Sequence, residues 1–299
     1  MGRSSSLVGH LLDVHDVLPC FKEFLEVDLR QSKKTVYEKT YYVKKFLTSQ
    51  TKPLSEVTRE DLRSYLKNFL EDNCTYKNSL ASLKTFFRDY LQKSEVVASF
   101  KFPRQPFKPK SIVTREQLVA FYQALTDLKE QALFLLYATS GLRRNEILGL
   151  NVQDLDLDNC MIIPNCHTGN TKKSYLSFFN SEALEILKQY LEVRKANNGH
   201  SEKLFPFARQ TVKKLWSTAR LKTGLDITPQ RLREFFCMQM SELGVQDRFI
   251  DAMCGRTPKS ILARNYTDYN PTKLKSIYEK AHLRILDPQP EPQLIQVTA

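Results

Sequence analysis

The stretch Ala138-Thr-Ser-Gly-Leu-Arg-Arg-Asn-Glu-Ile-Leu-Gly-Leu150 joins two predicted helices of different character. It continues from Ala132-Leu-Phe-Leu-Leu-Tyr-Ala138, which is apolar on every face and therefore predicts a helix buried in a core. Gly141 is a typical residue for the end of such a helix. Apolar residues at helical spacing after Arg143 predict a second, amphipathic helix. We therefore expect the side chain of Arg143 at a junction that core residues anchor on both sides.

An arginine held at such a junction has two possible roles. Its planar guanidinium can present paired N–H donors to a phosphate. Alternatively, Arg143 caps the second helix or forms a salt bridge, for example with Glu146. Taken alone, Arg143 is better explained by the structural role, so a phosphate site depends on the other segments.

Two further segments combine arginines with apolar helix faces. In Thr228-Pro-Gln-Arg-Leu-Arg-Glu-Phe-Phe236 the proline suits the first turn of a helix, which places Arg233 near the helix N-terminus. The helix dipole repels cations and attracts anions there, so Arg233 predicts a bound anion. In Cys254-Gly-Arg-Thr-Pro-Lys-Ser-Ile-Leu-Ala-Arg-Asn-Tyr-Thr-Asp268, Arg256 begins a turn and Tyr266 follows a short helical stretch.

A β-hairpin is predicted between these arginine segments. Asn159-Cys-Met-Ile-Ile163 and Ser174-Tyr-Leu-Ser-Phe-Phe179 have the composition of short strands, and a turn-rich stretch separates them. Helices are expected again from Ser181 to about Ala281. The chain should therefore be mainly α-helical with a small β-hairpin or sheet.

Together these segments resemble the tyrosine recombinase (phage integrase) family over residues 112–282, and the last segment is most similar to integrases of archaeal viruses and plasmids. The resemblance implies a nucleophilic tyrosine, Tyr266, which attacks a DNA phosphodiester and forms a 3′-phosphotyrosyl bond. It assigns Arg143 and Arg233 to the phosphate and Glu146 to Arg143 as its acidic companion. It also implies that neither ATP nor a metal or other cofactor takes part.

The turn of the hairpin, with His167-Thr-Gly-Asn-Thr-Lys-Lys173, resembles the turn that carries the family's catalytic lysine. The resemblance implies Lys172 for this role, with Lys173 as the alternative. Two positions depart from the family pattern: Gln230 stands where a histidine is usual, and Arg256 stands where histidine or tryptophan is usual. Glutamine only forms hydrogen bonds, so the group that accepts the tyrosine proton stays open.

The chain is expected to contain two domains. Residues 15–101 carry apolar stripes at helical spacing, and Thr58-Arg-Glu-Asp61 predicts a helix start within them. The resemblance implies that this block is the family's helical core-binding domain, which contacts DNA. Three prolines and several cations in residues 102–112 predict an extended linker. Residues 113–286 would form the catalytic domain, starting at the capping box Thr114-Arg-Glu-Gln117, with a flexible start (1–14) and tail (287–299).

Composition supports a polyanionic partner without proving one. The net charge of +12 favours phosphate binding, although charge also serves solubility. Six scattered cysteines without a C-x-x-C pair and five dispersed histidines argue against zinc, and we expect reduced, mostly buried thiols. No apolar run reaches the roughly 18 residues that span a bilayer. Without a secretory signal, the protein is expected in the cytoplasm, associated with the nucleoid.

The resemblance implies a homotetramer on double-stranded DNA at an attachment site, which for such elements can lie within a tRNA gene. Residues 274–286 would dock either on a neighbouring subunit or on their own domain. Two alternatives remain: a type IB topoisomerase-like nicking-closing activity, and a recombinase-derived DNA-binding protein that has lost catalysis, with Gln230 as a sign of that loss. Tyr269 is close enough to Tyr266 to replace it as the nucleophile.

Overall fold

The structure is a computed structural model that describes residues 14–104, 111–164, 176–197, 201–206, 211–256, 265 and 267–287. The chain divides into two compact units, residues 1–109 and 110–299, each with its own core. Residues 1–13 of the predicted flexible start, residues 288–299 of the predicted tail and residues 105–110 of the predicted linker lie outside the described residues. The roles assigned to the two predicted domains stay predictions.

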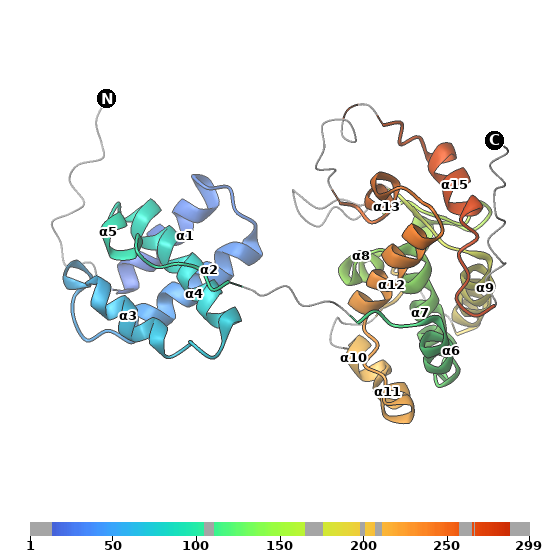
Figure 1. The fold of residues 1–299 in the computed structure, drawn as a ribbon, viewed down its shortest axis with the longest axis horizontal. Coiled ribbons are helices and arrows are strands. Elements are labelled where there is room, and N and C mark those ends of the chain that lie inside the picture. The colour runs from blue at the N-terminus through green and yellow to red at the C-terminus, as the bar shows by residue number, and fades with distance from the viewer. Residues whose placement is uncertain are drawn as a thin grey trace, which may run out of the picture. The chain divides into compact units, whose positions relative to one another are not determined.

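The first unit is helical throughout its described part (Figure 1). Its α-helices are α1 (Val14–Val27), α2 (Lys33–Leu47), α3 (Arg59–Lys67), α4 (Asn73–Lys84) and α5 (Ser94–Val97), with a 3-10 turn at Leu54–Glu56 and a π-helical segment at Thr85–Tyr90. Phenylalanine rings fill the core: Phe21 and Phe86 meet edge to face with centroids 5.0 Å apart, which is a favourable geometry for aromatic pairs. The predicted start of α3 is confirmed, because the Thr58 N–H donates to Asp61 Oδ2 at 2.6 Å.

The second unit surrounds one buried helix (Figure 1). Its α-helices are α6 (Arg115–Gln123), α7 (Leu128–Ser140), α8 (Arg144–Gly149), α9 (Ser181–Ala196), α10 (Thr211–Leu215), α11 (Ser217–Thr223), α12 (Pro229–Glu242), α13 (Asp247–Met253) and α15 (Pro271–Lys280). As its composition predicts, α7 is buried from Ala132 to Ser140, and it packs against α9 and α12. This packing holds the N-terminal end of α12, with its charged residues, beside the C-terminal end of α7.

A small antiparallel sheet covers another part of this core. Its strands, β1 (Leu155–Asp156), β2 (Met161–Ile162) and β3 (Ser177–Phe178), pair in the order β1-β2-β3, with Leu155 opposite Ile162 and Met161 opposite Phe178. The predicted hairpin corresponds to β2 and β3, whereas β1 is an addition. The prediction of a mainly helical chain with a small sheet is confirmed.

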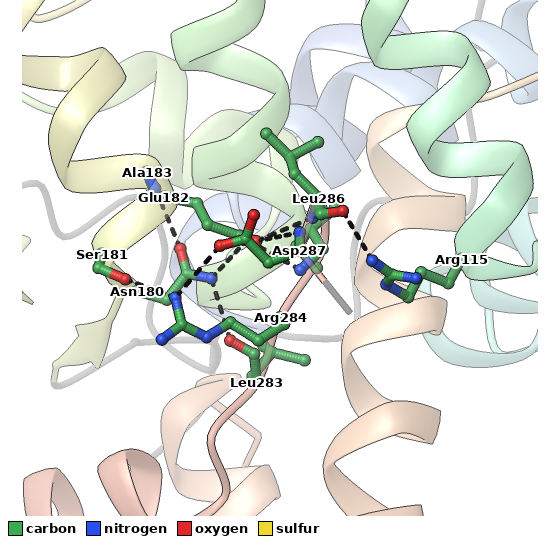
Figure 2. A network of polar contacts seen from close by, with 10 residues as sticks. Arg115, Asn180, Ser181, Glu182, Ala183, Leu283, Arg284, Leu286 and Asp287 are labelled. Atoms are coloured by element: carbon green, nitrogen blue, oxygen red, sulfur yellow. Dashed lines mark hydrogen bonds and ion pairs between the residues drawn. The ribbon is translucent and has the colours of Figure 1, made fainter. Parts of the chain in front are cut away.

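The end of the described chain docks on its own unit, which is one of the two alternatives left open by the sequence. In α15 the Leu274 side chain is buried, and the buried Tyr278 hydroxyl donates to the Thr139 carbonyl at 2.8 Å. Figure 2 shows the next contact, in which the buried Glu182 carboxylate accepts the backbone N–H groups of residues 285, 286 and 287 at 2.8–2.9 Å. Arg115 fixes the same segment by donating to the Leu286 carbonyl at 2.6 Å.

Candidate active site

Arg143 stands where the sequence places it, between α7 and α8. Gly141 ends α7 with φ +63°, and a Cβ added there would lie 2.3 Å from the Phe236 ring. The Arg143 N–H donates to Glu146 Oε2 at 2.7 Å, and Arg143 Nη1 donates both to Glu146 Oε1 at 2.8 Å and to the Gly255 carbonyl at 3.1 Å. The pairing with Glu146 is therefore present, and the same guanidinium also reaches the turn after α13.

Arg233 reaches that turn from a different helix. It lies in the first turns of α12, which Thr228 caps by accepting the Arg231 N–H at 3.3 Å. The residue is only 5% exposed, and its guanidinium donates to the carbonyls of Gly141 at 2.6 Å and Cys254 at 2.9 Å. Among the described residues, no carboxylate forms an ion pair with it. Burial of a cation without an ion-pair partner costs free energy, and a bound anion would offset this cost.

Arg256 is the third cation of the cluster. It follows Gly255, whose φ of +59° turns the chain after α13. Arg256 Nη1 donates to Asp251 Oδ1 at 3.0 Å, and Nη2 donates to the Cys237 sulfur at 3.3 Å. Its guanidinium is thus fixed in the same neighbourhood as the other two.

The three guanidiniums act on one another electrostatically. Burial lowers the pKa of Arg233, and the positive charges of Arg143 and Arg256 lower it further, while negative charge at the nearby cysteine sulfurs opposes this. Arg143 and Arg233 also bind the carbonyls of two consecutive residues, Gly255 and Cys254. An anion bound here would relieve the repulsion and meet donors that are already oriented. We name Arg143, Arg233 and Arg256 the arginine cluster.

Of the remaining predicted site residues, Gln230 alone lies in the part of the chain that the structure describes. Gln230 lies one turn before Arg233 on α12, and its amide donates along the helix to Glu234 Oε1 at 3.1 Å. Lys172, Lys173 and Tyr266 lie outside the described residues, so their roles stay predictions.

The alternative nucleophile, Tyr269, is partly buried within the second unit. Its ring packs near Phe249 with centroids 6.4 Å apart, and it lies against the apolar core. Tyr266 lies outside the described residues, so the choice between Tyr266 and Tyr269 as the nucleophile stays a prediction.

Sequence analysis missed a pair of thiols beside the cluster. Cys237 and Cys254, 17 residues apart in the chain, have their sulfur atoms 3.5 Å apart. Their positions held a signal, since Cys237 lies one helical turn after Arg233 and Cys254 immediately precedes the Gly255-Arg256 turn. The expectation of mostly buried thiols is wrong, because Cys254 alone is buried among the described cysteines, and Cys20 and Cys74 are exposed.

Three guanidiniums around one turn offer planar N–H donors of the kind that pair with phosphate oxygens. The model of the phage integrase family matches residues 111–273, more than half of the chain and all three arginines. The chain therefore belongs to the phage integrase family, and the resemblance predicted from its motifs is confirmed. Among the described residues, no helix is both long and apolar enough to cross a membrane.

The similarity to known proteins extends beyond residues 111–273, the region that the family model matches. Tyrosine recombinase XerA of Pyrococcus horikoshii is 26% identical over 280 residues, covering 90% of this chain and 94% of that protein. Tyrosine recombinase XerC of Leptospira interrogans is 24% identical over 288 residues, covering 88% and 91% respectively.

Solved structures share the fold. A lambda integrase tetramer bound to a Holliday junction has a TM-score of 0.66 at 18% identity, covering 87% of this chain and 78% of that one. The Tn1549 transposon integrase in complex with circular intermediate DNA has a TM-score of 0.64 at 18% identity, covering 87% and 98% respectively.

Proposed function

We propose that this protein is a site-specific DNA recombinase, an integrase that cleaves and rejoins double-stranded DNA to insert or excise a mobile element. The observation that carries the proposal is the arginine cluster, in which Arg143 before α8 and Arg233 on α12 donate to consecutive carbonyls. Membership of the phage integrase family supports the reaction class. The net charge of +12 supports a DNA substrate.

The proposed reaction is a transesterification at phosphorus. The phenolic oxygen of Tyr266 bonds to the scissile phosphate, the bond from phosphorus to the 5′-oxygen breaks, and a 3′-phosphotyrosyl enzyme remains. The covalent intermediate keeps the energy of the phosphodiester, so rejoining to a 5′-hydroxyl of a second duplex needs no ATP. The arginine cluster would stabilise the negative charge that develops on the non-bridging oxygens.

Proton transfers are assigned to the remaining predicted residues. Lys172, or Lys173 in its place, would protonate the departing 5′-oxygen, since nearby positive charge favours proton release from an ammonium group. Gln230 and Arg256 act as hydrogen-bond donors to the phosphate, because neither exchanges a proton near neutral pH.

A suicide substrate tests the proposal. The probe is a nicked duplex that spans the junction between the element and its flanking DNA, from which the cleaved strand is lost by diffusion. Wild-type protein should accumulate a covalent DNA adduct, Tyr266→Phe should form none, and Tyr269→Phe should still form it. An adduct that depends on Tyr269 would contradict the assignment of the nucleophile.

The same assay separates the alternative functions. Relaxation of supercoiled plasmid without sequence preference would indicate a topoisomerase-like enzyme. Binding to the junction duplex with no adduct under any condition would indicate a DNA-binding protein without catalysis.

Assembly and target are further parts of the proposal. In this proposal the protein forms a homotetramer on two duplexes, and residues 15–101 contact the DNA. The attachment site lies within a tRNA gene, and the protein is associated with the nucleoid. The fold shared with a lambda integrase tetramer on a Holliday junction supports this assembly. Sequencing of the insertion junctions tests the target, and insertion away from tRNA genes would contradict it.

A further inference from the structure

A dithiol lies against the arginine cluster. Cys237 is on α12 and Cys254 follows α13, and their sulfur atoms are 3.5 Å apart. Each cysteine also contacts the cluster: the Cys237 sulfur accepts a hydrogen bond from Arg256, and the Cys254 carbonyl accepts one from Arg233. A chemical change at this sulfur pair therefore acts directly on Arg256 and, through the backbone of Cys254, on Arg233.

The two thiols have different surroundings. The hydrogen bond from Cys254 lowers the pKa of Cys237, and the positive charges of Arg256 and Arg233 lower it further. The pKa of Cys254 is raised because it donates that hydrogen bond and is buried. Cys237 is also the more exposed of the two. Because Cys237 is the more exposed thiol and its sulfur accepts the hydrogen bond from Arg256, Cys237 is the expected attacking thiolate and Cys254 the expected resolving partner.

No other described cysteine has such surroundings. Cys20 and Cys74 are exposed in the first unit, and burial raises the pKa of Cys160. Among the cysteines that the structure describes, Cys237 and Cys254 form the one pair with their sulfurs in contact. Exposed Cys74 therefore serves as a matched control.

We propose that Cys237 and Cys254 are a redox site, which a hydroperoxide closes to a disulfide, reversibly lowering DNA cleavage. In the first step the Cys237 thiolate attacks the hydroxyl oxygen of the hydroperoxide, the O–O bond breaks, and the alkoxide (hydroxide, for hydrogen peroxide) leaves, so that sulfur is oxidised to a sulfenic acid. In the second step the Cys254 sulfur attacks Cys237. The S–S bond forms, and the sulfenic hydroxyl leaves as water with the thiol proton.

Formation of the disulfide is expected to change the geometry of the arginine cluster. A disulfide has an S–S length of about 2.05 Å, so the sulfurs must approach one another by about 1.5 Å from their present separation. Arg256 then loses the Cys237 thiolate as a hydrogen-bond acceptor. Cys254, whose carbonyl accepts a hydrogen bond from Arg233, moves toward α12. Because displacements of about 1 Å can reduce catalysis by about 100-fold, we expect cleavage to fall at least about tenfold.

Mapping of the bond tests the chemistry. The full-length protein, freed of reductant, is treated with hydrogen peroxide, blocked with N-ethylmaleimide and digested for mass spectrometry. A Cys237–Cys254 linked peptide is expected, lighter by two hydrogen atoms than the separate peptides and lost on treatment with dithiothreitol, while Cys20 and Cys74 are alkylated. Full alkylation of Cys237 and Cys254 after peroxide would overturn the proposal, as would a bond already complete in protein never exposed to oxidant.

Variants and activity complete the test. Cys237→Ser and Cys254→Ser should each abolish the linked peptide, and Cys74→Ser should retain it. With the suicide substrate, wild type and Cys74→Ser should lose adduct formation after peroxide and regain it with dithiothreitol. If the oxidised protein cleaves as fast as the dithiol form, the regulatory part of the proposal is overturned. This arm alone rests on the proposed function. A linked peptide in a protein that never cleaves DNA would contradict that function and still establish the redox site.

Discussion

Arg233 is held by contacts that require the planar shape of a guanidinium. Two nitrogens of its guanidinium each bind a different carbonyl, Gly141 and Cys254, from a nearly buried position. A lysine ammonium is a point donor and cannot reproduce this planar arrangement while also facing a phosphate.

Arg233→Lys is therefore expected to lower adduct formation on the suicide substrate by about 100-fold, the usual loss for one transition-state donor. Arg231→Lys is the matched control, because Arg231 lies on the same helix but donates to the carbonyls of Asp226 and Ser111. Equal losses in the two variants would show that Arg233 has no special role in the chemistry.

Gly141 is the residue on which the position of both Arg143 and Arg233 depends. Its left-handed conformation disfavours any side chain, and a Cβ would lie 2.3 Å from Phe236 and 2.9 Å from the Cys254 sulfur. Gly141→Ala should lower the free energy of unfolding by about 2–4 kcal/mol, which combines backbone strain with overpacking.

Gly224→Ala isolates the strain component of that loss. Gly224 has a similar φ of +68° but open space around it, so its alanine variant should lose about 1 kcal/mol. Urea unfolding followed by the fluorescence of Trp216, the single tryptophan, reads the second unit in both variants. Similar losses at both glycines would contradict the close packing around Gly141.

At the scale of elements, the start of α9 determines where the chain after α15 lies. The buried Glu182 carboxylate accepts hydrogen bonds from the backbone N–H groups of residues 285, 286 and 287 (Figure 2). Glu182→Gln replaces a charged acceptor by a neutral one and introduces an N–H group beside those donors. The substitution should weaken the docking by about 1–3 kcal/mol.

Hydrogen exchange measures this docking directly. Amides 285–287 should exchange roughly fivefold to 150-fold faster in Glu182→Gln, which is the same range expressed as an opening equilibrium. The amides of α15 should be less affected, because Tyr278 holds that helix independently. Glu185→Gln, on an exposed position of α9, should leave all these amides unchanged. Unchanged exchange in Glu182→Gln would show that other contacts hold the segment.

Much of the molecule was predictable from local sequence. Capping boxes at Thr58 and Thr114, the apolar α7 and the junction at Gly141 each depend on neighbouring residues, and each is found where the sequence predicts it. Strand β1 was missed because two residues carry no periodicity. The carbonyls that hold Arg233 and the Cys237–Cys254 contact depend on how α12 packs beside α7 and α13, which spacing along the chain does not determine.

The whole molecule contains two separate apolar cores, one in residues 17–97 and one in residues 113–285. Because each core closes within its own unit, we expect a fragment of residues 110–299 to fold alone, with the thermal midpoint of Trp216 fluorescence found in the full chain. A decrease beyond about 2–4 °C, the shift that 1 kcal/mol produces in a domain of this size, would show that the first unit stabilises the second. The fragment should also bind duplex DNA more weakly and with a shallower dependence on salt, since it lacks the cations of the first unit. An unchanged salt slope would mean that those cations do not contact phosphates.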